Sequence, residues 1–222
     1  MELSGAKKTA SLIFKIVVVL SAAVGTLMSF YAGREAFMGG GKIFLYFTIQ
    51  SNIFIAAISA VGAILRLTGA RIGGPLYAVK LVGTVSITLT GVVFCFVLAP
   101  TLGARAWNVH NVLTHVVVPV LSVADFFLVT PPGKTGVKTL PLVLVPPTAY
   151  GIFAAVGFVL GWEFSAGKNY PYFFLNWGDP VGVFGFSRAF PFMGPFWWVV
   201  VLYIFIASVG LLFVSLTGRK RK

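Results

Sequence analysis

Six stretches of mainly apolar residues recur along the chain, and they constrain its fold more than any other feature. A helix needs about 20 such residues to cross the hydrocarbon core of a bilayer. A mean hydropathy of +0.96, with only 10% charged residues, lies outside the range of soluble globular domains. We therefore expect an all-α, polytopic membrane bundle that forms a single domain over residues 1–222. The expected spans are about 9–31, 44–66, 77–99, 108–129, 140–162 and 195–216.

The first stretch follows Lys7 and Lys8 and therefore has an alternative interpretation as a secretory signal peptide. Its apolar run is longer than that of a typical signal peptide, and no small-residue cleavage site precedes polar mature sequence. We therefore expect it to be retained as a membrane span. The only cysteine, Cys95, lies inside the third span, which excludes a disulfide within the chain and a cysteine-based zinc site.

The distribution of basic residues predicts the orientation of the bundle. With the N-terminus in the cytoplasm, most Lys and Arg residues fall on the inner side, and the positive-inside rule then places both termini inside. The basic residues left on the outer side are Arg34, Lys42, Arg105, Lys168 and Arg188. A net charge of +12 could indicate a nucleic-acid partner, but the charges are spread over membrane-flanking loops. Contact with anionic lipid headgroups explains them better, so we expect membrane lipids and no nucleic acid as partners. The oligomeric state stays open.

Polar side chains form a stripe on the second span and another on the fourth. At about 100° per residue, Thr48, Ser51, Asn52 and Ser59 share one face of a helix, whereas Gln50 points the other way. The stripe on the fourth span consists of Asn108, Asn111, Thr114, His115, Ser122 and Asp125. Because unpaired polar groups in hydrocarbon are costly, we expect both stripes to face a common interior. For small hydroxyls such as Ser59 and Ser122, ordinary hydrogen bonds between helices are the preferred interpretation.

His115 is the candidate general base, because a neutral imidazole supplies an acceptor with a pKa near physiological pH. Counted from the flanking charges Lys42 and Arg105, Thr48 and His115 lie about one helical turn apart in depth. A Thr or Ser hydroxyl near such a base is a candidate nucleophile. By depth alone, Ser51 or Asn52 fits slightly better than Thr48.

Acyl transfer also needs hydrogen-bond donors for the developing oxyanion, and Asn52 and Asn111 lie on suitable faces. Asp125 lies about 15 Å deeper than His115 along the same helix, too far to complete a catalytic triad. We expect Asp125 to form a structural ion pair with Lys80 or Lys15. The long segment 165–194 is aromatic and rich in proline, and it is either a functional cover or a seal for the bundle.

Three motifs together resemble the androgen-induced family of six-span membrane hydrolases, particularly its prokaryotic branch. They are "YFTIQSN" at the start of the second span, "HNVLTHVVVPVLSVAD" in the fourth and "NYPYFFLNW" in the long loop. Eukaryotic members of that family are threonine hydrolases that cleave fatty acid esters of hydroxy fatty acids. The resemblance implies that Thr48 is the nucleophile and His115 the base, with His110 as the alternative base. It also implies a bacterial cytoplasmic membrane protein.

The resulting hypothesis is a lipid hydrolase that cleaves fatty-acyl esters inside the membrane without a metal or cofactor. The loop around Tyr170 and Pro171 is expected to act as its lid. The alternative is a carrier or binding protein for a lipid or small molecule, without catalytic activity. A purely structural bundle is a third interpretation, but it leaves the Thr, Asn and His groups without a role.

Overall fold

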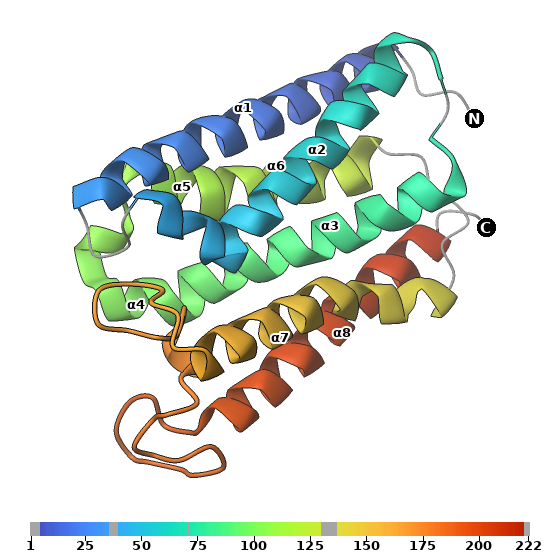
Figure 1. Cartoon of the computed structure of the whole chain (residues 1–222). Helices are drawn as coiled ribbons and strands as arrows, with labels where there is room; N and C mark the ends of the chain where they lie inside the picture. Colours follow the sequence, from blue (N-terminus) through green and yellow to red (C-terminus); the bar gives the residue numbers. More distant parts are fainter. Residues whose placement is uncertain (1–4, 36–39, 71, 130–136, 220–222) are drawn as a thin grey trace.

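The computed structural model describes residues 5–35, 40–70, 72–129 and 137–219, and six helices in these ranges are long and apolar enough to cross a membrane. Apart from two isolated bridges, the regular structure in these ranges is helical. The predicted all-α membrane bundle is therefore confirmed. The helices run up and down along one axis, with the ends of α1 and α8 that lie nearest the chain termini at the same end (Figure 1). We call this the terminal end, and the opposite end the loop end.

Three of the six spans are single helices: α1 (Gly5–Glu35), α2 (Phe47–Leu67) and α8 (Pro195–Arg219). The other three change helical type along their length. The third span consists of α3 (Gly74–Val93), the π-helical segment η2 (Phe94–Leu98) and α4 (Ala99–Leu102). The fourth consists of α5 (Val109–Val112), the π-helical η4 (Leu113–Val117), α6 (Val118–Ala124) and the π-helical η5 (Asp125–Val129). The fifth begins as the 3₁₀ segment η6 (Val137–Leu144) and continues as α7 (Val145–Val159).

Prolines account for part of this irregularity. Pro141 lies inside η6; it has no N–H for an α-helical hydrogen bond, and its ring would clash with the carbonyl four residues earlier, so a regular α-helix is disfavoured here. Pro146 and Pro147 then fall in the first turn of α7, where an N–H has no helical partner in any case. The third span reaches further than the predicted 77–99, and it ends at Gly103, whose φ of 61° requires a residue without a Cβ.

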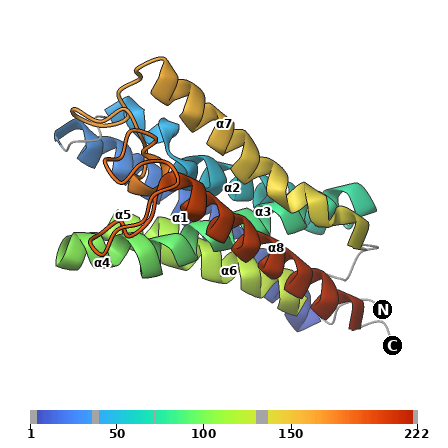
Figure 2. The same ribbon diagram turned by 90° about the horizontal axis from the view of Figure 1, so that it is seen from below.

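The third span is the central helix of the bundle. In its most apolar window 61% of the residues are buried, compared with 22% for the fifth and sixth spans. The first, second and fourth spans pack on one side of α3, and α7 and α8 lie on the other (Figures 1 and 2). The backbone of α8 packs closely against η6 but not against α7. Side chains must therefore bridge the space between α7 and α8.

The long loop between α7 and α8 lies at the loop end of the bundle (Figure 1). It contains the short 3₁₀ turn η7 (Phe173–Leu175), which follows a Tyr172 in extended conformation. The ring of Tyr172 stacks on that of Phe174, with centroids 5.0 Å apart and an interplanar angle of 7°. The ring of Phe173 meets Trp198 of α8 edge on. Aromatic packing thus fixes this part of the loop to the helices beneath it.

A centre of charged side chains lies inside the bundle towards the terminal end, where Asp125 is 2% exposed. Its carboxylate accepts hydrogen bonds from Lys15 of α1 at 2.7 and 2.8 Å, from Lys80 of α3, and from Ser11 at 3.0 Å. We expected either Lys80 or Lys15 to pair with Asp125, and in the structure both lysines do so. This ionic cluster, Ser11, Lys15, Lys80 and Asp125, ties the first, third and fourth spans together.

Candidate active site

Thr48 and His115 meet at the loop end of the bundle. Thr48 lies in the first turn of α2, and its Oγ1 is 3.3 Å from Nε2 of His115 in the fourth span. Thr48 is half-buried, whereas His115 is only 8% exposed. The two groups are therefore within reach of a proton transfer, and the imidazole is shielded from solvent by the protein.

The hydrogen bonds of His115 determine which ring nitrogen carries the proton. Nδ1 lies 3.0 Å from the carbonyl oxygen of Asn111, which can only accept. It also lies 3.0 Å from Oγ1 of Thr114, whose own proton is donated to the carbonyl oxygen of His110. Nδ1 must therefore carry the hydrogen, which leaves the lone pair of Nε2 facing the Thr48 hydroxyl. In this tautomer, the imidazole can accept the Thr48 proton.

The backbone around His115 is widened into the π-helical segment η4, a feature that is frequent at functional sites. Pro119 has no N–H to donate to the His115 carbonyl, so the regular α-helical bonding is interrupted here. Gly91 of α3 lies against the same carbonyl. Only a residue without a side chain allows this approach, since a Cβ at this position would lie 2.9 Å from the carbonyl oxygen. The ring of Phe94 stacks on the imidazole, with centroids 3.8 Å apart. Proline, glycine and an aromatic ring thus fix the position and plane of His115.

Ser51, which fits the predicted depth slightly better than Thr48, does not face His115. Its hydroxyl lies 2.7 Å from Oγ1 of Thr90 in α3 and donates to the Thr48 carbonyl at 3.0 Å. Because 100° per residue separates Thr48 and Ser51 by about 60° around α2, a small helix rotation decides which hydroxyl reaches the fourth span. The structure gives that position to Thr48.

The two asparagines predicted to bind an oxyanion have other partners. Both N–H groups of Asn52 donate to backbone carbonyls, to Thr48 at 2.8 Å and Thr114 at 3.1 Å. Asn111 donates its side-chain N–H to the carbonyl of Ala106 at 2.9 Å. No described hydrogen bond of these two side chains supports the predicted role as oxyanion donors, and neither residue lines the cavity at Thr48. Asn52 instead connects the backbone segments that carry Thr48 and His115, and the Asn111 carbonyl orients the imidazole.

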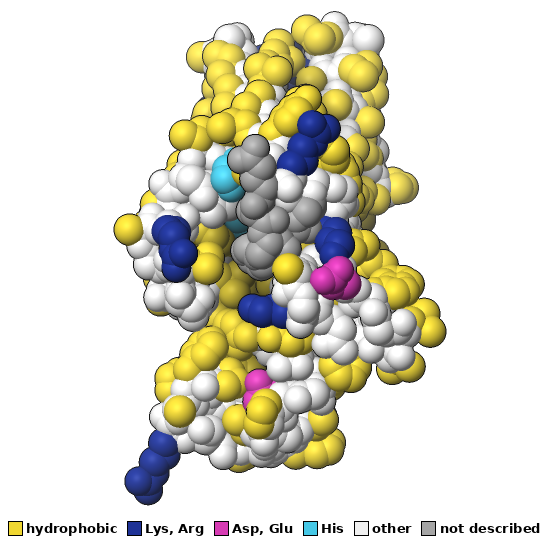
Figure 3. Space-filling view, turned by 60° about the vertical axis from the view of Figure 1, so that its left-hand side comes forward, with side chains coloured by type: hydrophobic (Ala, Val, Ile, Leu, Met, Phe, Trp, Pro, Cys, Tyr) yellow, Lys and Arg dark blue, Asp and Glu magenta, His cyan; other side chains and the backbone are white. Residues whose placement is uncertain are grey.

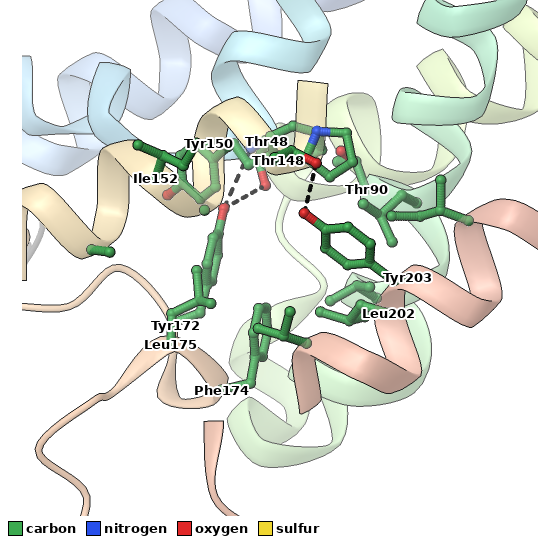
Figure 4. A pocket seen from close by; sticks show the side chains of 18 of the residues that line it. Thr48, Thr90, Thr148, Tyr150, Ile152, Tyr172, Phe174, Leu175, Leu202 and Tyr203 are labelled. Carbon is green, nitrogen blue, oxygen red and sulfur yellow. Dashed lines mark hydrogen bonds between the residues drawn. The ribbon is translucent and has the colours of Figure 1, made fainter. Parts of the chain in front are cut away.

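Tyr172 of the long loop supplies a polar group that the sequence did not single out. Its hydroxyl accepts a hydrogen bond from the Thr48 N–H at 3.4 Å and lies 3.5 Å from Thr48 Oγ1 (Figure 4). Burial raises the pKa of the Tyr172 phenol, so the group keeps its proton and can donate it. The motif "NYPYFFLNW" contains this residue, but the tyrosine that reaches the site could not be known without the turn at η7.

The predicted lid residues lie beside the site and not in it. Tyr170 is half-buried and Pro171 is buried, whereas the loop residues that line the cavity at Thr48 are Tyr172, Phe174, Leu175 and Trp177. The extended backbone at Tyr172 and the turn that follows direct these side chains inward. The segment therefore does cover the site, but through residues 172–177, which follow the predicted Tyr170 and Pro171.

Thr48 opens into a cavity of about 280 Å³, close to the lower limit of about 300 Å³ for small-molecule pockets. The walls come from the start of α2, the end of α3, the long loop, α7 and α8 (Figure 4). We expected the second and fourth spans to line a common interior. Instead, His115 lies behind Thr48, and the cavity extends away from it towards α7 and α8. The polar stripe of the fourth span is used mainly for hydrogen bonds and for the ionic cluster. The exception is Ser122: we expected its hydroxyl to bond between helices, but it is buried without a hydrogen-bond partner in the part of the chain that the structure describes.

His110, the alternative base, is half-buried one turn before Thr114. Its carbonyl accepts the Thr114 hydrogen bond, but no described contact joins its ring to Thr48.

The face at the loop end carries scattered basic side chains among many hydrophobic ones (Figure 3). The only ion pair described there joins Lys42, before α2, to Glu163 of the loop at 2.6 Å.

No protein-family model, no curated protein and no solved structure matches this chain. What the protein does must therefore be inferred from the side chains of the site.

Proposed function

We propose that the protein is an intramembrane lipid hydrolase that cleaves fatty-acyl esters with Thr48 as nucleophile and His115 as general base. The single observation that carries this proposal is the 3.3 Å contact between Thr48 Oγ1 and His115 Nε2. A hydroxyl is a weak nucleophile until a base removes its proton, and this pair supplies both groups. The resemblance to the androgen-induced family supports the same two roles, with substrates such as fatty acid esters of hydroxy fatty acids.

In the first half of the reaction, Thr48 Oγ1 attacks the ester carbonyl carbon while its proton moves to His115 Nε2. The bond between the carbonyl carbon and the alcohol oxygen then breaks, and the imidazolium returns the proton to the leaving alcohol. This leaves an acyl-threonine intermediate. In the second half, His115 accepts a proton from a water molecule that attacks the acyl carbon. The fatty acid leaves as Thr48 regains its proton.

The backbone carbonyl of Asn111 orients the imidazole, a role that a carboxylate has in a catalytic triad. It accepts the Nδ1–H of His115 at 3.0 Å and so keeps the lone pair on Nε2. A carbonyl carries only a partial charge, so it stabilises the imidazolium less than an aspartate would. We therefore expect a slow enzyme whose selectivity depends on the cavity.

Tyr172 is the donor that we assign to the oxyanion. Its hydroxyl lies beside Thr48 and lines the cavity, where the carbonyl oxygen of a bound ester would lie. The raised pKa of the phenol keeps the hydrogen available. The aromatic loop residues around it exclude bulk water, which strengthens this interaction.

The substrate enters from the membrane in this proposal. The apolar walls between α7 and α8 suit an acyl chain, and both helices are largely exposed along the surface that faces lipid. The distribution of basic residues favours both termini in the cytoplasm, so that the loop end faces outward. The ester is then drawn from the outer leaflet of the membrane.

The cavity alone would also fit a carrier that binds a lipid without changing it. The two proposals differ in what they require of Thr48 and His115. A carrier needs only a cavity of suitable shape and polarity, whereas hydrolysis needs the hydroxyl and the imidazole in contact. Binding without turnover by the folded wild-type protein would therefore support the carrier.

Turnover of a long-chain fatty-acyl ester by protein purified in detergent or nanodiscs tests the hydrolase. Thr48→Val and His115→Gln should each lower the rate by about 100-fold or more, because either change removes one partner of the proton transfer. Ser51→Ala is the matched control, since Ser51 lies one turn away on the same helix and bonds to Thr90. A rate that survives Thr48→Val but is lost in Ser51→Ala would transfer the nucleophile to Ser51 and contradict the proposal.

A further inference from the structure

A second pair of hydroxyl groups faces the cavity away from Thr48. Thr148 in the first turn of α7 and Tyr203 of α8 both line it, and their oxygens lie 2.6 Å apart (Figure 4). Tyr203 lies about 12 Å along α8 from Pro195 at 1.5 Å per residue, so the pair is deeper in the bundle than Thr48. The bond bridges two helices whose backbones do not pack closely.

The direction of the hydrogen bonds in this pair follows from a third partner. The Thr148 hydroxyl donates its only proton to the carbonyl oxygen of Leu144, at 2.6 Å. Because that proton is used, the bond between the two hydroxyls must be donated by Tyr203. The Tyr203 oxygen then has no proton left, but it keeps a lone pair. At this point, the cavity offers an acceptor and not a donor.

No Lys, Arg, Asp, Glu or His is found among the described residues that line the cavity. An ionised carboxylate placed here would lose its hydration without gaining a cation, which is costly in an apolar site. Its oxygens would also face the lone pair of Tyr203. A ligand with a free hydroxyl, in contrast, can donate to Tyr203 and remains neutral.

We infer that the Thr148–Tyr203 pair is a specificity subsite for a hydroxyl group, and that the preferred substrate is an uncharged acyl ester that carries a free hydroxyl. A fatty acid ester of a hydroxy fatty acid, which has a carboxylate and no free hydroxyl, would then fit only with its carboxylate outside this part of the cavity. This inference rests on the proposed hydrolase function for the word substrate, but the preference itself concerns binding. An ester with a free carboxylate in its buried part is disfavoured by the same groups. The subsite selects the ligand after its acyl chain has entered between α7 and α8.

Photo-crosslinking with three matched probes tests the inference without requiring hydrolysis. All three are non-hydrolysable alkyl ethers with the same diazirine-bearing chain: one ends in a glycerol with free hydroxyls, one in the same glycerol with both hydroxyls methylated, and one in a carboxylate. Labelling of α7 and α8 peptides in nanodiscs is quantified by mass spectrometry. The hydroxyl probe should label the wild-type protein several-fold more than either of the others.

Two variants assign that preference to the subsite. Thr148→Val combined with Tyr203→Phe removes both hydroxyls, so the hydroxyl and methylated probes should label equally; Tyr203→Phe alone would free an acceptor lone pair on Thr148. Thr148→Val keeps the phenol but frees its proton to donate, so the advantage of the hydroxyl probe over the carboxylate should fall several-fold. Tyr31→Phe, a change at an exposed tyrosine of α1, is the control and should leave the preference intact. Thermal unfolding of each variant identifies any general loss of structure.

Equal labelling by all three probes, or stronger labelling by the carboxylate, would overturn the inference. So would a hydroxyl preference that survives the double change Thr148→Val with Tyr203→Phe in a folded protein, since the pair would then only hold α7 against α8. Thr48→Val separates this result from the fate of the hydrolase. A hydroxyl preference that persists in Thr48→Val, together with no turnover by the wild type, would refute the hydrolase and keep the subsite.

Discussion

Two polar centres lie in the same apolar bundle, and they differ in charge, exposure and surroundings. The ionic cluster near the terminal end is fully enclosed and contains formal charges. The centre at Thr48 and His115 consists of neutral groups and opens into a cavity. Charges in hydrocarbon are tolerated only when each has a partner, which suits a structural tie. Neutral groups beside a cavity remain available to react.

The two centres also share one helix. The fourth span supplies Asp125 to the ionic cluster and His115 to the candidate active site, about 15 Å apart at 1.5 Å per residue. The ionic cluster therefore holds the span whose other half positions the imidazole. If this comparison is right, changes at Asp125 should affect stability first, and changes around His115 should affect rate first.

Asp125→Asn should have the largest effect on stability of any single change at the two centres. Removing one member of a buried ion pair typically costs about 3 to 5 kcal/mol, because the remaining charge is left in the apolar interior. Here Lys15 and Lys80 would both lose their carboxylate partner. Thermal unfolding in detergent should show a drop in Tm of many degrees. Asp179→Asn, in the long loop, is the control with an expected change near zero; equal Tm values for the two variants would contradict the structural role.

Tyr172→Phe should lower turnover by about 100-fold with little change in KM, because an oxyanion donor acts mainly in the transition state. The stability should change little, since the aromatic ring and its stacking on Phe174 are retained.

Burial raises the pKa of the Tyr172 phenol above its usual value of 10, so the donor should not be lost as the pH rises through 10. A wild-type rate that falls with an apparent pKa near 10, and a Tyr172→Phe rate that does not, would show an ordinary exposed phenol in its place.

Gly91→Ala should lower turnover by about 10-fold and have a smaller effect on stability than Asp125→Asn. The added Cβ would lie 2.9 Å from the His115 carbonyl oxygen and 3.0 Å from Pro119, so the π-helical segment must shift. Gly74→Ala at the start of the same helix is the matched control, because its Cβ would meet nothing within 4 Å. Activity assays and Tm measurements on both variants check this. If Gly91→Ala behaves like Gly74→Ala, the position of His115 does not depend on this contact.

Glu163→Gln should have the smallest effect, seen only as a change in pH dependence. The Lys42 ammonium and the Gly167 N–H bind the carboxylate and lower the pKa of Glu163. The unfolded chain therefore takes up this proton before the folded one does, and the stabilisation present above the usual pKa of 4.5 is lost as the pH falls. Wild-type Tm should fall by about 1 to 2 °C more than that of the variant between pH 6 and pH 4. A steeper fall in the variant would contradict this.

Composition and periodicity were sufficient to predict the membrane bundle. Six apolar runs can satisfy their backbone only as helices, and polar residues spaced on one helix face must avoid lipid. The same arithmetic placed Asp125 beyond the reach of His115 and near lysines of other spans. These are properties of single helices, which sequence encodes directly.

The contents of the cavity could not be predicted in this way. The choice between Thr48 and Ser51 depends on a small rotation of α2 against its neighbours. The bonds of Ser51 to Thr90 and of Asn52 to the Thr114 backbone carbonyl accompany the observed rotation. Tyr172 reaches the site because of a loop turn, and Tyr203 because two distant helices approach each other. Asn52 and Asn111 lie on the predicted faces, but their side-chain N–H groups donate to backbone carbonyls. Every residue has a backbone carbonyl, so the sequence does not indicate which one will accept. Tertiary contacts of this kind leave no local signal.

The most direct test of the account is the site at which a serine- and threonine-directed fluorophosphonate attaches to the folded wild-type protein, mapped by tandem mass spectrometry. We expect a single adduct on Oγ1 of Thr48, formed at least about 100-fold more slowly in His115→Gln. An adduct on Ser51, or no adduct in protein that retains its structure, would contradict the claim that His115 activates Thr48.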